Sequence, residues 1–147
     1  MSDWARSIAF VLQQEGGYSI LRDDPGNWTG GAVGVGTLKG TKYGISAASY
    51  PALDIAALTQ AEAEAIYRRD YWEPSGAAAL AWPLCLLVLD TAVLHGVGAA
   101  RAWLGEAGPT PYAFAAKRLR TYTHSANWHA FGAGWVNRVA ALLEAMG

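Results

Sequence analysis

Residues 11–26, VLQQEGGYSILRDDPG, contain the point at which the chain changes character. Before it, apolar residues recur at helical spacing over residues 3–14, with Asp3 as the expected N-cap. The pair Gly16-Gly17 ends that pattern, and the polar run at residues 23–26 is a typical turn sequence. The stretch therefore predicts an N-terminal helix, with Glu15 in its last turn, followed by a polar loop.

Glycine dominates the next segment, from Ser19 to Gly44, where Val33, Val35 and Thr37 alternate with it. This alternation of glycine with β-branched residues predicts short strands and tight turns, either a small β-hairpin or a three-stranded ribbon.

Helical patterns occupy the remainder of the chain. Thr59-Gln60-Ala61-Glu62 has the form of a capping box and predicts a helix that carries Tyr67 and Tyr71. A loop is expected around Pro74-Ser75-Gly76, and further helices at residues 83–95, 101–104, 110–122 and 134–146. The last of these would carry an apolar side, formed by Val136, Val139, Leu142 and Leu143. The predicted fold class is α+β and mostly α, in a single domain over residues 1–147.

Composition excludes several classes of protein. The chain has 147 residues and a net charge of −1, which is a poor basis for binding nucleic acid. Its one cysteine, Cys85, lies in an apolar run and is expected to be inert packing. The uncharged stretch from Pro74 to Leu89 is too short to span a membrane and contains Pro83. No signal peptide is visible at the N-terminus, so we expect synthesis in the cytoplasm.

Other catalytic motifs fail on spacing. Residues 34–39 place a lysine where a dinucleotide fingerprint needs its third glycine, and residues 40–42 invert the order used in phosphate loops. His124 and His129 do not share a helical face, so no metal site and no cofactor are expected. His95 lies in an apolar helix, which favours a core histidine over a ligand or base.

The remaining candidates for a catalytic site are acidic residues. The carboxyl of Glu15 would lie at the negative end of a helix dipole, in a cleft, and near Asp24 if the loop folds back. All three effects favour a protonated Glu15, the state that a general acid needs, whereas Asp24 in its polar loop with Asp23 is easier to keep ionised. Such a pair is typical of glycoside cleavage, although a glutamate before glycines is more often only a solvated helix end.

Several motifs, in order, resemble glycoside hydrolase family 108, which comprises phage and bacterial cell-wall muramidases. They are Glu15-Gly16-Gly17-Tyr18, Asp23-Asp24-Pro25-Gly26, Thr41-Lys42-Tyr43-Gly44-Ile45-Ser46, the block at residues 66–72, the helical stretches at 89–96 and 100–104, and the block at 131–139. The resemblance implies a lysozyme-like fold, with residues 8–80 as the catalytic region and 81–145 as a helical lobe. A substrate cleft is expected between the lobes.

The resemblance also implies roles for particular residues. Glu15 would be the catalytic acid, and Asp24 and Thr41 would hold the attacking water, as in phage lysozymes of related shape. If water fits between the two carboxyls, they should lie roughly 6.5–9.5 Å apart and the product should invert. Substrate-binding residues are expected at Tyr18, Trp28, Tyr43 and Ser46. Trp28 has two interpretations, a groove wall or a local anchor of its loop.

Three departures from the family pattern stand out. His95 replaces a usual asparagine, and residues 105–111 lack the family's glycine-rich loop. The second departure weakens a separate wall-binding role for the C-terminal region, which we interpret as part of the helical lobe. The insert from Asn27 to Gly40 should extend the β lobe over the cleft.

The leading hypothesis is a muramidase that cleaves the β-1,4 bond between N-acetylmuramic acid and N-acetylglucosamine. Alternatives are a lytic transglycosylase, a non-catalytic wall-binding or virion structural module, and an interaction protein using residues 77–89. The expected partner is bacterial peptidoglycan, without nucleic acid or stable membrane insertion, and the expected state is a monomer. A phage endolysin released through a holin to act on the cell wall is the simplest biology.

Overall fold

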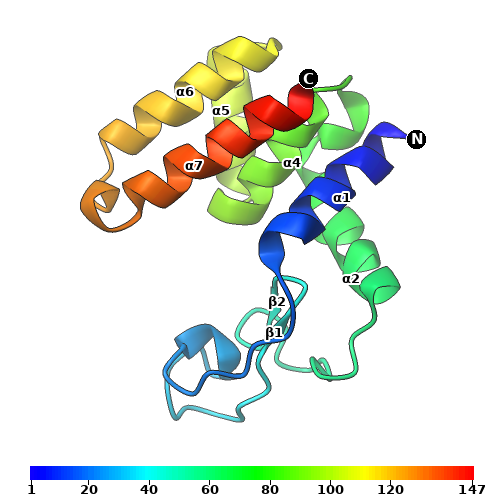
Figure 1. Ribbon diagram of the computed structural model, residues 1–147, viewed down its shortest axis with the longest axis vertical. Coiled ribbons are helices and arrows are strands. Elements are labelled where there is room, and N and C mark those ends of the chain that lie inside the picture. Colours follow the sequence, from blue (N-terminus) through cyan, green and yellow to red (C-terminus); the bar gives the residue numbers. More distant parts are fainter. The chain divides into compact units, whose positions relative to one another are not determined.

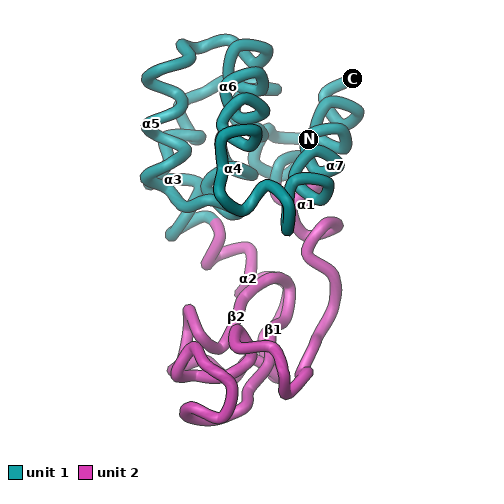
Figure 2. The backbone as a smooth tube through the Cα atoms, turned by 90° about the vertical axis from the view of Figure 1, so that its left-hand side faces the viewer, with its two compact units in different colours: residues 1–7, 68–147 teal, residues 8–67 magenta.

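The computed structural model describes all 147 residues, which divide into two compact units coloured separately in Figure 2. Unit 1 comprises residues 1–7 and 68–147, and unit 2 comprises residues 8–67. Helices dominate and the sheet has two strands, so the predicted lysozyme-like α+β, mostly α fold is confirmed (Figure 1). No helix combines the length and the apolar character needed to cross a membrane.

The N-terminal helix α1 covers Asp3–Glu15, as predicted, and Gly16 leaves it with a φ of +72°. The expected cap was wrong by one residue. The Ser2 hydroxyl accepts the Ala5 N–H at 3.1 Å, and Asp3 is already helical. A hydroxyl reaches the third amide of the first turn as well as a carboxylate does, and local sequence does not separate the two.

Unit 2 is built around an antiparallel hairpin of β1 (Thr41–Lys42) and β2 (Ile45–Ser46), in which Thr41 pairs with Ser46. A small hairpin was one of the two predicted arrangements, but its strands lie at residues 41–46, and the alternating residues Val33, Val35 and Thr37 form no strand. An isolated bridge joins Ser19 to Thr41, and the short helix η1 (Pro25–Asn27) precedes the hairpin.

The insert at residues 27–40 folds back on itself within unit 2. An isolated bridge joins Trp28 to Leu38, and Thr29 N–H donates to the Thr37 carbonyl at 2.9 Å. A Cβ on Gly30 would lie 2.3 Å from a Val35 methyl, so the two arms approach closely. The insert thus enlarges the β-containing part of the unit, as its length indicated.

Helix α2 (Gln60–Tyr67) closes unit 2 and begins with the predicted capping box. Thr59 N–H donates to Glu62 Oε2 at 2.8 Å, and Glu62 N–H donates to Thr59 Oγ1 at 3.2 Å. These bonds hold the pKa of Glu62 below its usual value, because they favour the carboxylate. In unit 1 the chain continues through the π-helix η2 (Arg68–Trp72) and α3 (Glu73–Ser75), so helical structure passes Pro74, where a loop was expected.

Unit 1 is a bundle around the buried helix α4 (Leu84–His95), which Pro83 precedes as predicted. A 3₁₀ turn, η3 (Ala77–Ala79), leads into it, and α4 packs against α5 (Val97–Ala107) and α6 (Pro111–Thr123). Helix α7 (Trp128–Met146) lies along α6. Cys85 is buried and unpaired in α4, as its apolar neighbours indicated.

Three predictions about the later helices were wrong. Helix α5 is longer than expected, because Gly98 and Gly105 do not interrupt it. Helix α7 begins at Trp128 instead of residue 134. Of its expected inward residues Val139 and Leu142 are buried, whereas Val136 and Leu143 are exposed.

Candidate active site

Glu15 is the last residue of α1, and its half-buried side chain packs against the turn of the β1–β2 hairpin. A Cβ placed on Gly44 would lie 2.9 Å from Glu15 Cγ and 3.0 Å from Glu15 Cβ. Only a residue without a side chain leaves room for the carboxylate stem there. The end of α1 is thereby held to the hairpin at a specific point.

The hairpin turn itself is unusual in sequence. Tyr43 and Gly44 both have positive φ, +53° and +77°, the pattern of a two-residue type I′ turn. A tyrosine in the left-handed region costs free energy unless its surroundings hold it there. Tyr67, buried at the end of α2, supplies such a hold, because its hydroxyl donates to the Tyr43 carbonyl at 2.7 Å. Three segments of unit 2 therefore meet at Gly44.

Asp24 lies at the N-terminus of η1, where its Oδ1 accepts the Gly26 N–H at 2.8 Å. The residue is exposed, and so is its neighbour Asp23. Because one oxygen is fixed by the backbone amide, the second has a defined direction. A carboxylate held in this way can accept a hydrogen bond from water or from a sugar.

The side chain of Thr41 is oriented by Asn27, which is fully buried. Thr41 Oγ1 donates to Asn27 Oδ1 at 2.7 Å, and Asn27 Nδ2 donates to the Leu21 carbonyl at 3.0 Å. The hydroxyl proton of Thr41 is thus committed to Asn27, so the hydroxyl offers only lone pairs to any further partner. A water beside Thr41 would donate to it and keep its own lone pair for attack.

Asn27 also links the two expected water-holding residues. Its backbone N–H donates to the Asp24 carbonyl at 3.1 Å, while its side chain holds Thr41. None of Asn27, Gly44 and Tyr67 was predicted as a site residue. Two of them could have been found from local signals, because Asn27 follows an Asp-Pro-Gly turn and Gly44 lies between two short strands.

The expected substrate-binding residues have different environments. Ser46 pairs with Thr41 across the hairpin, and its Oγ accepts the Ser49 N–H at 3.2 Å. Tyr43 is half-buried in the turn that contacts Glu15. Tyr18 is 44% exposed, and its hydroxyl donates to the Lys39 carbonyl at 3.1 Å.

Trp28 is not an open groove wall, and that interpretation was wrong. Its side chain is 8% exposed, and the indole N–H donates to the Arg22 carbonyl at 2.8 Å. An indole buries its apolar body readily once its N–H has a partner. Trp28 is therefore the local anchor of its loop.

His95 belongs to a buried polar network in unit 1. Its Nε2 lies 2.8 Å from the Tyr122 hydroxyl, which accepts a bond from Arg118 Nε. The Tyr122 hydroxyl can donate its own proton to Nε2 of a neutral imidazole. Burial, and secondly the charge of Arg118, lower the pKa of His95 to about 4, although Asp90 acts in the opposite direction. His95 is thus half-buried with one ring nitrogen paired, which agrees with the predicted packing role better than with a ligand or base.

The network continues to Asp90, which is fully buried in α4. Its two oxygens lie 2.8 Å from Arg118 Nη1 and 2.7 Å from Arg138 Nη2. Arg118 Nη1 also donates to Thr91 Oγ1 at 3.0 Å. No set of His, Cys, Asp and Glu side chains here or elsewhere is grouped to hold a metal ion.

The chain belongs to glycoside hydrolase family 108, because the family model "Glycosyl hydrolase 108" matches residues 8–96, more than half of its length. No curated protein sequence matches it.

Among solved structures, that of Brucella abortus SagA is similar to this chain with a TM-score of 0.72 and 22% sequence identity. The similarity covers 97% of this chain and 92% of SagA. At this identity the comparison concerns the fold, and it extends over the C-terminal helices that the family model does not reach.

Proposed function

We propose that the protein is a muramidase, which hydrolyses the β-1,4 bond between N-acetylmuramic acid and N-acetylglucosamine in peptidoglycan. The observation that carries the proposal is the seating of Glu15 on the bare backbone of Gly44, in a chain of a glycoside hydrolase family. Its substrate class places its site of action at the bacterial cell wall.

In the proposed reaction Glu15 donates its proton to the glycosidic oxygen as the bond to the anomeric carbon breaks. A water held by Asp24 and Thr41 attacks that carbon. Thr41 can only accept a hydrogen bond from this water, since its own proton is given to Asn27. Asp24 takes the proton that the water loses. After cleavage Glu15 is ionised and Asp24 is protonated. Asp24 must therefore release its proton to solvent, and Glu15 must take one up, before the next cleavage.

The test is digestion of purified peptidoglycan by the wild type, Glu15→Gln and Glu144→Gln, with masses of the released muropeptides. Glu144 lies exposed on α7 and gives a matched glutamate control in the other unit. We expect hydrolysed products from wild type and control and at least about a hundredfold loss in Glu15→Gln.

Three other outcomes contradict the proposal in different ways. Products lighter by one water, about 18 Da, indicate a lytic transglycosylase, which uses one carboxyl and no attacking water. Undiminished lysis by a folded Glu15→Gln protein removes that residue from the chemistry. Wall binding without any cleavage by the wild type indicates a non-catalytic module.

A further inference from the structure

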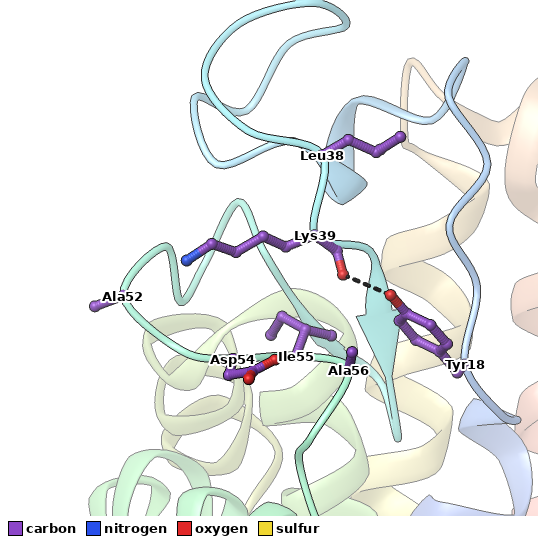
Figure 3. Close-up of a pocket in the computed structure, with 7 residues that line it drawn as sticks. All are labelled: Tyr18, Leu38, Lys39, Ala52, Asp54, Ile55 and Ala56. Carbon is purple, nitrogen blue, oxygen red and sulfur yellow. Dashed lines mark hydrogen bonds between the residues drawn. The ribbon is translucent and has the colours of Figure 1, made fainter.

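Unit 2 contains an open cavity of about 470 Å³ whose lining residues take no part in the proton transfer and water positioning proposed above. Its sides are Tyr18, the chain at Leu38 and Lys39, and a loop at residues 52–56 (Figure 3). The volume lies in the range of small-molecule sites. The lining combines an aromatic ring, apolar groups and a carboxylate.

The ring of Tyr18 is fixed in place although it is 44% exposed. Its hydroxyl donates to the Lys39 carbonyl at 3.1 Å, the bond drawn in Figure 3. A Cβ on Gly40 would lie 2.8 Å from Tyr18 Cε2, so the ring edge rests on bare backbone. A ring anchored in this way presents an apolar surface to the cavity and loses little conformational entropy when a ligand covers it.

The loop at residues 52–56 is held by two lysines, Lys39 and Lys42, which precede and belong to strand β1. Lys39 Nζ donates to the Pro51 carbonyl at 2.7 Å and to the Leu53 carbonyl at 3.3 Å. Lys42 Nζ donates to the Ala56 carbonyl at 2.9 Å. The loop at residues 52–56 is therefore tied to the chain at Lys39 and to strand β1 before any ligand arrives.

Asp54 is the acidic group of the cavity. Its Oδ1 accepts the Ala57 N–H at 3.3 Å, and the residue is exposed, so Oδ2 is available as an acceptor. Lys39 also lines the cavity, with its ammonium bonded to two backbone carbonyls, so the lining carries one positive and one negative charge. A neutral ligand with hydroxyl or amide donors and one apolar face fits this lining better than a phosphate does.

We propose that this cavity binds one N-acetylated amino sugar of the glycan strand, outside the bond that is cleaved. The apolar face of the sugar covers the Tyr18 ring, and an N–H or O–H of the sugar donates to Asp54 Oδ2. The inference rests on the proposed function, because that function supplies a glycan composed of such sugars.

The test is a titration of ¹⁵N-labelled Glu15→Gln protein with the trimer of N-acetylglucosamine, which carries no peptide and cannot be cleaved by this variant. We expect chemical-shift changes at the amides of Tyr18, Lys39, Asp54 and Ala56. Tyr18→Ala should weaken binding about tenfold and Asp54→Asn about threefold. The side-chain oxygen in Asp54→Asn can still accept the Ala57 N–H, so the loop keeps its turn.

Tyr18→Phe and Tyr112→Ala serve as controls. Tyr18→Phe keeps the ring and should keep most of the affinity, which separates loss of the stacking surface from misfolding. Tyr112 is 78% exposed in unit 1, and its substitution should leave binding unchanged. With the catalytically active chain and peptidoglycan, Tyr18→Ala should raise KM about tenfold and change kcat less than about twofold.

Two results overturn the cavity assignment alone. One is a trimer titration without shifts at these amides while the wild type cleaves peptidoglycan. The other is equal affinity of Tyr18→Ala and the parent for the trimer. Failure of the proposed function looks different, since the wild type would then release no product although the trimer still titrates the cavity.

Discussion

Replacing Gly44 by alanine tests whether the glutamate and the hairpin turn form one unit. The new Cβ would lie 2.3 Å from the Tyr67 hydroxyl and within 3.0 Å of two Glu15 carbons, at a φ of +77°. Gly34 provides a matched control, because it has a φ of +79° and no atom within 4 Å of such a Cβ. Both substitutions carry the same backbone strain, and only the first has a collision.

The magnitude follows from these contacts. Alanine in the left-handed region costs about 1–2 kcal/mol, partly offset by the reduced entropy of the unfolded chain, and this part is common to both variants. Moving the buried Tyr67 hydroxyl breaks its bond to the Tyr43 carbonyl, which costs about 1 kcal/mol, and overpacking adds about 1–3 kcal/mol. Gly44→Ala should therefore be less stable than Gly34→Ala by about 2–4 kcal/mol.

The assay is urea unfolding of both variants, followed by circular dichroism, together with kcat on peptidoglycan at a temperature where both are folded. A displacement of Glu15 by about 1 Å should lower kcat by roughly a hundredfold in Gly44→Ala. Tyr67→Phe removes the atom at 2.3 Å, so the double variant should recover part of the loss. Equal stability and equal kcat of the two alanine variants would refute the reasoning.

Three further predictions concern residues away from this contact. Asp90→Asn should lower the free energy of unfolding by about 3–5 kcal/mol in a urea titration, because two guanidinium groups lose their buried counter-charge. The pKa of His95 is about 4 in the folded state and ordinarily 6.5, so unfolding takes up a proton when the pH lies below 6.5. The contribution of neutral His95 to stability should thus be fully present above pH 6.5, and the melting temperature should fall as the pH drops towards 4. His95→Gln should make the melting temperature depend less on pH over this range, and an unchanged slope counts against the neutral imidazole. Trp28→Phe should lower the melting temperature through its lost bond to the Arg22 carbonyl while leaving KM unchanged, and a raised KM would restore the groove-wall interpretation.

Local signals were reliable where a short motif determines its own geometry. The end of α1 at Glu15, the box at Thr59 and Glu62, and the start of α4 after Pro83 all follow from interactions between near neighbours in the chain. The turn of the hairpin also has a local reason, since the glycine next to Tyr43 satisfies the φ that the turn requires, although the strands were expected earlier in the chain.

The early start of α7 was not predicted, because one of its glycines has a packing role that local sequence does not reveal. A Cβ on Gly132 would lie 2.5 Å from the Trp128 ring, so this glycine accommodates an indole one turn earlier and does not end a helix. Trp28 shows the same limit, because a glycine-rich neighbourhood suggests exposure while its partner at Arg22 buries it. The roles of Asn27 and Tyr67 depend on bonds over 14 and 24 residues, which no spacing in the sequence reveals.

The buried ionic network shows why the C-terminal helices belong to the fold of this enzyme. Asp90 lies within the matched residues 8–96, but Arg118 and Arg138, which neutralise it, lie beyond them on α6 and α7. A carboxylate without solvent exposure is strongly destabilising when its partners are removed. We therefore expect Arg118 and Arg138 to be needed for α4 to stay folded, independently of any affinity for the cell wall.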